Sequence, residues 1–172
     1  MIFNKDKHKV SLYNNLLVLS RNIFFYKKIN LTDSFETRIY LMFFHFSIMM
    51  IVFKRKGSKF DQGSYDSLFH NIEYNLRELG FGDVSVNKKM KDLNKILYDI
   101  LLKLDINVKG QFKINDDLFF KYFKEIGVEK NEKHSNLSRY FVNFYDFCFE
   151  LSLNSMVKNA INFKYNYGSS KT

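Results

Sequence analysis

Apolar residues recur every three or four positions along most of this 172-residue chain, which is the spacing of one face of an α-helix. No segment alternates between apolar and polar positions well enough to predict a strand, and the chain contains no proline to interrupt a helix. The pattern predicts helices at about 10–28, 34–55, 64–79, 85–104, 116–127 and 135–156. The expected fold is therefore an all-α, single-domain bundle of about five to six helices.

The pattern weakens at both ends of the chain. Residues 1–9 and 162–172 are mostly polar, and we expect a flexible N-terminus and a flexible tail on either side of a helical domain at 10–161. The first residues lack the apolar stretch of a secretory signal. The sequence therefore predicts no secretory signal.

The most apolar run is at 39–53, with 15 residues. A helix that spans a bilayer needs about 20. This length favours a buried central helix, with a shallow membrane-associated helix as the alternative.

The net charge of +9 is concentrated in the first third of the chain. Residues 1–60 hold 11 Lys or Arg against 3 Asp or Glu, whereas residues 61–172 hold 16 against 15. Such a basic segment attracts phosphate-rich or anionic lipid surfaces. Charge alone thus leaves an RNA- or ribosome-binding role open.

Catalytic and metal-binding motifs are absent from the sequence. The four histidines are scattered, and neither a phosphate-binding loop nor a Gly-x-Ser-x-Gly elbow occurs. The single cysteine, Cys148, cannot form an internal disulfide and fits a reducing compartment. We therefore expect no enzymatic activity, no metal site and no cofactor.

The stretch 72–90 combines helical periodicity with two glycines in a tight corner. Its first half predicts the end of a helix, with Gly80 as a left-handed capping residue because glycine has no Cβ to clash there. Gly82 gives a second flexible point, and Asp83 or Ser85 is expected to cap the next helix through a side-chain oxygen. The corner therefore joins two helices.

Charged side chains at this corner have two competing interpretations. Arg77, Glu78 and Asp83 either pair with one another and with the helix ends, or bind another molecule. Arg38 and His45 lie on the apolar helix and also have two interpretations. They are either a buried pair whose hydrogen bonds are satisfied within the protein, or part of a binding groove.

A family resemblance starts from this corner. Leu-Arg-Glu-Leu-Gly-Phe-Gly-Asp at 76–83, followed by Lys88, Lys89 and Met90, resembles the signature of the ubiquinol–cytochrome c chaperone family, which are assembly factors for the respiratory cytochrome bc complex. Shorter fragments in the same order extend the resemblance over roughly 12–98: Ser20-Arg21, Phe25-Tyr26, Thr37-Arg38 and Phe44-His45. The chain departs from the family at Leu97-Tyr98-Asp99-Ile100, where a Phe-Tyr-Gly-Arg-like step is expected.

The resemblance implies a non-catalytic chaperone that binds newly made cytochrome b and assists biogenesis of the ubiquinol–cytochrome c reductase complex. Implied partners are cytochrome b or another respiratory membrane subunit, the ribosome and the anionic inner-membrane surface, but not DNA, with a cytoplasmic location peripheral at the inner membrane. The candidate client-binding residues are Arg21, Tyr26, Arg38, His45, Arg77, Glu78, Gly80, Gly82, Asp83, Lys88 and Lys89. The alternative function is a basic helical RNA- or ribosome-binding module.

Overall fold

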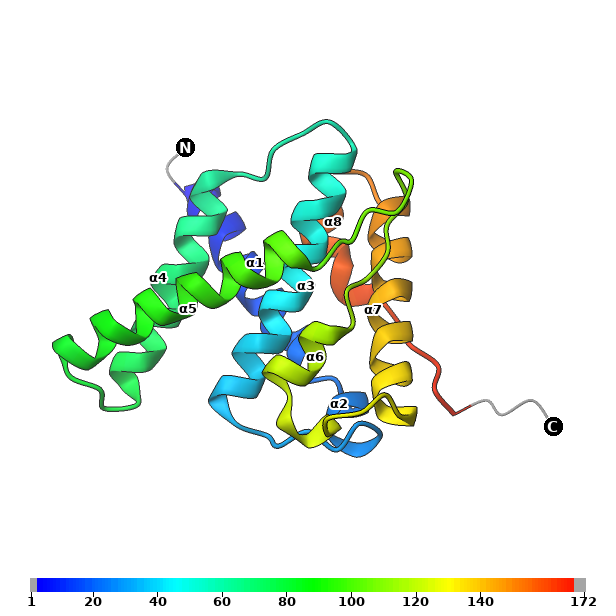
Figure 1. The fold of residues 1–172 in the computed structure, drawn as a ribbon. Coiled ribbons are helices and arrows are strands. Elements are labelled where there is room, and N and C mark those ends of the chain that lie inside the picture. Colours follow the sequence, from blue (N-terminus) through cyan, green and yellow to red (C-terminus); the bar gives the residue numbers. More distant parts are fainter. Residues whose placement is uncertain (1–2, 169–172) are drawn as a thin grey trace.

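Five long helices form the body of the protein in a computed structural model that describes residues 3–168, with side chains from Leu12 onward (Figure 1). The helices are α1 (Phe3–Ser20), α2 (Ile23–Lys27), α3 (Phe35–Arg55), α4 (Gln62–Glu78), α5 (Asp83–Lys103), α6 (Asp117–Tyr122), α7 (Glu132–Glu150) and α8 (Met156–Asn159), with short 3-10 turns at Lys124–Ile126 and Ala160–Asn162. Residues 3–168 contain no β-strand beyond two isolated bridges in the loop after α5. The predicted all-α, single-domain fold is confirmed.

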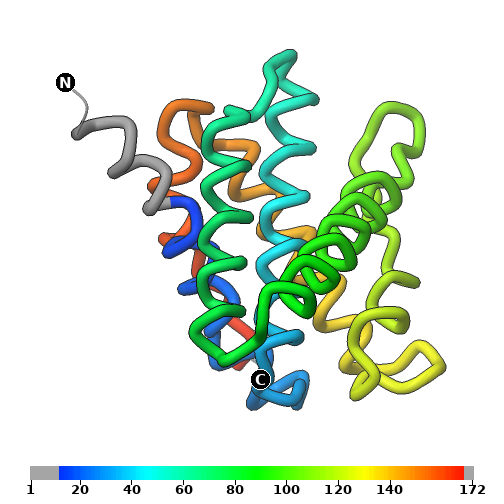
Figure 2. Tube along the Cα trace, turned by 90° about the vertical axis from the view of Figure 1, so that its left-hand side faces the viewer, coloured from blue at the N-terminus to red at the C-terminus, as the bar shows by residue number. Residues whose placement is uncertain are grey.

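Helix α3 lies at the centre of the bundle. It packs against α1, α5 and α7, and most of its residues from Ile39 to Val52 are buried. Helix α4 packs against α1, while α5 runs obliquely across α3 (Figure 2). Within the described part of the chain, α3 is the one helix long and apolar enough to cross a membrane, but 72% of its apolar window is buried inside the protein. The prediction of a buried central helix is confirmed.

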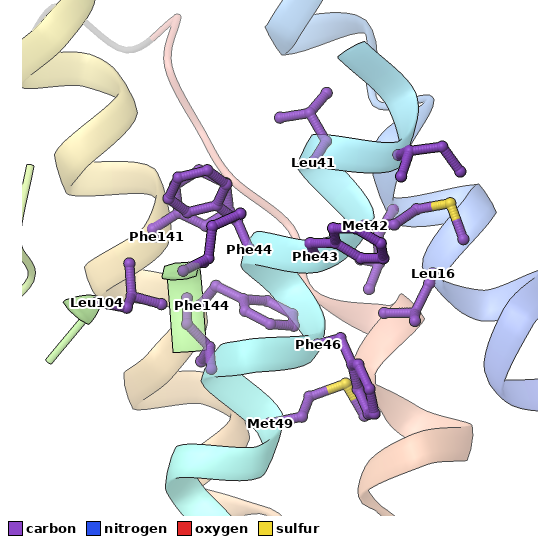
Figure 3. Packing of buried hydrophobic residues seen from close by; sticks show 14 of the residues in the cluster. Leu16, Leu41, Met42, Phe43, Phe44, Phe46, Met49, Leu104, Phe141 and Phe144 are labelled. Carbon is purple, nitrogen blue, oxygen red and sulfur yellow. The ribbon is translucent and has the colours of Figure 1, made fainter. Parts of the chain in front are cut away.

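Side chains on opposite faces of α3 enter different parts of the core (Figure 3). Phe44 faces α7, where its ring lies 5.3 Å from that of Phe141. Phe43 points the other way and stacks on Phe69 of α4 at 5.9 Å. Aromatic pairs of this kind add roughly 0.5–1.5 kcal/mol each beyond the area that they bury. The phenylalanines of α3 thus hold the helix from two sides at once.

The structure describes part of both end segments that the sequence predicts to be flexible. Helix α1 begins at Phe3, well before the predicted start at Val10; an existing helix extends readily into polar sequence because each added residue contributes one hydrogen bond. In the expected flexible tail, Phe163 is buried against Phe144, and the rings of Tyr165 and Tyr167 pack on Phe24. Their alternate spacing lets three rings of an extended segment face the same side. Residues 1–2 and 169–172 of the expected flexible ends lie outside the described residues.

His45 joins α3 to α7 inside this core. Its Nδ1 lies 2.6 Å from the carbonyl oxygen of Leu41, and its Nε2 lies 2.9 Å from the hydroxyl of Tyr140. A carbonyl oxygen only accepts, so Nδ1–H donates to Leu41 and Nε2 accepts the Tyr140 proton. Burial lowers the pKa of His45 to about 4, although the hydrogen bond to Leu41 opposes this shift. The histidine is therefore neutral and fully satisfied in the folded protein.

This burial predicts that the protein loses stability in mild acid. Between pH 6.5 and pH 4.5 the unfolded chain protonates His45 while the folded chain does not, so the free energy of unfolding should fall by ~2 kcal/mol. Urea unfolding at both pH values measures this loss. The His45→Leu/Tyr140→Phe variant removes the titrating group together with its partner and should lack this part of the loss. An equal decrease in both proteins would contradict the assignment.

Candidate functional site: a groove at the α4–α5 corner

The corner between α4 and α5 is built by two glycines with different tasks. Gly80 has φ +94°, and its N–H donates to the carbonyl of Arg77 at 3.0 Å while the N–H of Phe81 donates to that of Leu76 at 3.3 Å. This pair of hydrogen bonds is a Schellman motif, which closes the last turn of α4. The prediction of Gly80 as a left-handed cap is confirmed. Gly82 instead has an ordinary φ of −75° and is itself the N-cap of α5.

The expected side-chain cap at the start of α5 is wrong. Asp83 is the first residue of the helix, and neither it nor Ser85 caps the backbone, because Gly82 already occupies the capping position. The carboxylate of Asp83 instead accepts a hydrogen bond from Arg77, which also donates to Glu73 at 3.0 Å. Arg77 thus ties the end of α4 to the start of α5. Because these side chains are largely exposed, the pairs fix geometry more than they add stability.

An apolar groove of about 360 Å³ opens beside this corner. Its lining comes from the first turns of α3, the end of α4 and the middle of α5. Leu76 and Leu93 are buried at its base, while Leu79 and Phe81 remain 58% and 38% exposed at its edge. Phe35, Tyr40 and Ile96 complete the apolar lining, and Glu36, Lys89 and Asp92 add charge. Large apolar side chains left in water at a concave surface are typical of binding sites.

Phe81 owes its exposure to its place between the two glycines. It belongs to neither helix, so no helical face carries it into the core. The ammonium of Lys89, on the second turn of α5, lies 4.6 Å from the centre of its ring. A cation over an aromatic face is attracted by the ring electrons. Lys89 thus helps to hold Phe81 at the edge of the groove.

Asp99 supports the part of the groove that contains Tyr40, although it does not line the groove itself. Its carboxylate accepts hydrogen bonds from Lys103, Lys121 and Tyr122, with Lys121 Nζ at 2.6 Å. Burial alone would raise the pKa of Asp99, but these three hydrogen bonds hold it well below its usual range. The Tyr122 ring in turn packs edge-on against Tyr40 at 5.3 Å. Asp99, which lies in the stretch where the chain departs from the family resemblance, therefore anchors α6 to α5. Through Tyr122 it also positions Tyr40 in the groove.

Comparisons with known proteins identify the family. The family model described as ubiquinol-cytochrome C chaperone matches residues 27–117, which is more than half of the chain. This chain belongs to the ubiquinol–cytochrome c chaperone family. Its fold is similar to the crystal structure of the Cbp3 homolog from Brucella abortus, with a TM-score of 0.67 and 22% identity, covering 94% of this chain and 90% of that one. A search of curated proteins found no match.

The groove and the corner both lie within the stretch that matches the chaperone family. The resemblance predicted from the sequence is therefore confirmed. Assignment to this family also suggests a non-enzymatic role. Among the described residues, no three His, Cys, Asp or Glu side chains come close enough to hold a metal ion.

The predicted client-binding residues fall in three separate places. Seven lie at the corner and the start of α5: Arg77, Glu78, Gly80, Gly82, Asp83, Lys88 and Lys89. Of these only Lys89 lines the groove, while Lys88 is exposed on α5. His45 lies in the core, where both ring nitrogens are already hydrogen-bonded, so it offers no free nitrogen to a client or a haem.

The other three candidates gather where α1, α2 and α3 meet. Tyr26 donates to the carbonyl of Ser20 at 2.7 Å, and burial, followed by the charge of Asp33, raises its pKa to about 12 against the opposing effect of Arg38 and Arg21. Arg38 Nε lies 3.4 Å from the Asp33 carboxylate. These contacts order the chain between α1 and α3. Of the predicted client-binding residues, Lys89 alone lines the groove.

Sequence reasoning missed most of the residues that line the groove. By helical spacing Leu79 belongs to the apolar face of its helix, which is expected to be buried, and Phe35, Tyr40 and Asp92 carry no motif of their own. One signal was present in the sequence: Phe81 stands between Gly80 and Gly82, where an aromatic residue cannot join either helical face.

Replacing the two glycines separately tests the corner. Gly80→Ser should lower the free energy of unfolding by ~1–2 kcal/mol, because φ +94° is strained for any residue with a Cβ even though nothing lies within 4 Å of that atom. Gly82→Ser should be neutral or stabilise by a few tenths of a kcal/mol, because serine is a good N-cap. Chemical denaturation of both variants measures the difference. Equal effects would argue against the assigned backbone of the corner.

Proposed function

We propose that this chain is a non-catalytic assembly chaperone that binds newly made cytochrome b in the groove at the α4–α5 corner and assists biogenesis of the ubiquinol–cytochrome c reductase complex. Membership of the ubiquinol–cytochrome c chaperone family supports the role. The observation that carries the choice of site is the open, mainly apolar groove within the family-matched region, with Leu79 and Phe81 exposed at its edge.

The exposed apolar side chains of the groove leave free energy of burial unused in the unbound protein. Leu79 and Phe81 give up burial that would be worth about 25 cal/mol per Å² of apolar area. A client with an apolar segment recovers that free energy when it covers them, and an apolar face laid into a groove is a common way for proteins to hold a helix. Nascent cytochrome b, as a membrane subunit, offers such segments before it is assembled.

We further propose that the protein acts on the cytoplasmic side, peripheral at the inner membrane. A membrane subunit is made and inserted at that surface, and the basic N-terminal third of the chain favours anionic lipid headgroups. The same charge would also suit a site near the ribosome. Several of these basic residues already have carboxylate partners, such as Arg38 with Asp33 and Arg55 with Asp105. Charge alone therefore supports the RNA-binding alternative less than the groove supports client binding.

Site-specific crosslinking tests the proposal. A photo-reactive amino acid replaces Phe81 in the tagged protein, and the crosslinked material is recovered from native membranes and identified by mass spectrometry. Cytochrome b should be captured in the absence of the mature complex, because Phe81 lies at the edge of the groove. The same substitution at Val128, which is 92% exposed and lies outside the groove, is the matched control and should capture little or none.

Three outcomes would contradict the proposal in different ways. Equal capture from Phe81 and Val128 would remove the groove as the site. Capture of ribosomal RNA and ribosomal proteins alone would favour the RNA-binding module. Capture of cytochrome b only as part of the finished complex would argue against a role before assembly.

A further inference from the structure

Two carboxylates at the groove form no ion pair within the described part of the chain. Glu36 lies in the first turn of α3 and Asp92 lies in the middle of α5, and both belong to the groove lining. No described side chain forms an ion pair with either one. Other acidic residues nearby, such as Asp99 and Glu73, are paired with lysine or arginine. The charge at the groove is therefore unbalanced, although the whole chain carries +9.

The one basic residue of the groove does not restore the balance. Lys89 stands three residues before Asp92 on α5, yet its ammonium is placed over the Phe81 ring and not against that carboxylate. Glu36 is close enough to Tyr40 for its charge to raise the pKa of the phenol, after the larger effect of burial. Among the residues that line the groove, two carboxylates thus stand against one ammonium. A negative field beside apolar surface favours a cation on whatever occupies the groove.

The helix dipole explains only one of the two carboxylates. An acidic residue in the first turn of a helix is stabilised by the helix dipole, which accounts for Glu36 without any ligand. Asp92 lies in the third turn of α5, where that effect has decayed. The helix dipole therefore does not account for Asp92.

We propose that the groove recognises the junction between an apolar helical stretch and a basic residue of the client. Apolar side chains of the client would cover the exposed Leu79 and Phe81, and the lysine or arginine that follows would lie between Glu36 and Asp92. This inference rests on the proposed function and specifies the feature of the client that is bound. Membrane proteins carry such junctions at the cytoplasmic ends of their transmembrane helices, where Lys and Arg are enriched. The chemistry of the groove thus matches one end of a membrane helix and not its centre.

A charge-swap binding experiment tests the inference. The probe is a fluorescent, helix-forming peptide with leucines at i, i+4 and i+7 and a lysine one turn further, and its counterpart has glutamate in place of the lysine. The unmodified protein should bind the lysine peptide about tenfold more tightly than the glutamate peptide, and the preference should weaken as salt is added. The Glu36→Lys/Asp92→Lys variant should reverse the preference.

Matched variants separate local recognition from net charge and from loss of fold. Glu129→Lys/Glu150→Lys changes the total charge by the same amount at exposed positions outside the groove, and it should keep the lysine preference. Glu36→Gln/Asp92→Asn removes both charges without placing a cation at the start of α3, and it should bind both peptides about equally. Circular dichroism confirms that each variant is folded before binding is measured.

Failure of this inference is distinguishable from failure of the proposed function. Equal affinity of the unmodified protein for the two peptides, absence of binding to either, or an unchanged preference in the charge-swap variant would each overturn the junction as the recognised feature. Cytochrome b captured at Phe81 together with any of these results would leave the chaperone function in place. Loss of that capture, with the peptide preference intact, would overturn the client assignment instead.

Discussion

Burial of α3 on nearly all sides is the constraint on which the rest of the structure depends. A helix that is apolar around its whole circumference must be covered by other elements, and α1, α5 and α7 supply that cover. The one buried histidine of this helix is accommodated because a main-chain carbonyl and a tyrosine hydroxyl satisfy both of its ring nitrogens. The interior therefore remains apolar in effect, although it contains a titratable group.

The same helix connects the core to the groove. Its buried middle fixes its direction, and its first turns then present Phe35, Glu36 and Tyr40 to the surface beside α4 and α5. Asp99 and Tyr122 hold Tyr40 from the side of α6. A site assembled from rigid helices, supported by a second layer of contacts, keeps its shape without a bound partner. A preformed groove of this kind would lower the ordering cost of holding a client.

Local geometry at the corner explains why apolar groups stay exposed there. The Schellman motif at Gly80 ends α4 abruptly, and Gly82 starts α5 without a side-chain cap, so Phe81 is left between two helices. Arg77 then fixes the angle of the turn through carboxylates on both helices. The exposed groups are thus a consequence of a well-ordered turn and not of poor packing. This order is consistent with a surface that binds and releases apolar segments.

The sequence by itself determined the class of fold, the buried central helix, the left-handed glycine and the family. Each of these depends on residues close together in the chain: helical periodicity, the missing Cβ of Gly80 and the motif at 76–83. The groove depended on tertiary structure, because α3 meets α4 and α5 through residues some 40 to 60 positions apart. Tertiary packing likewise placed His45 in the core and the rings of Phe163, Tyr165 and Tyr167 against it. Periodicity shows which side of a helix is apolar, but only the packed bundle decides which part of that side stays uncovered.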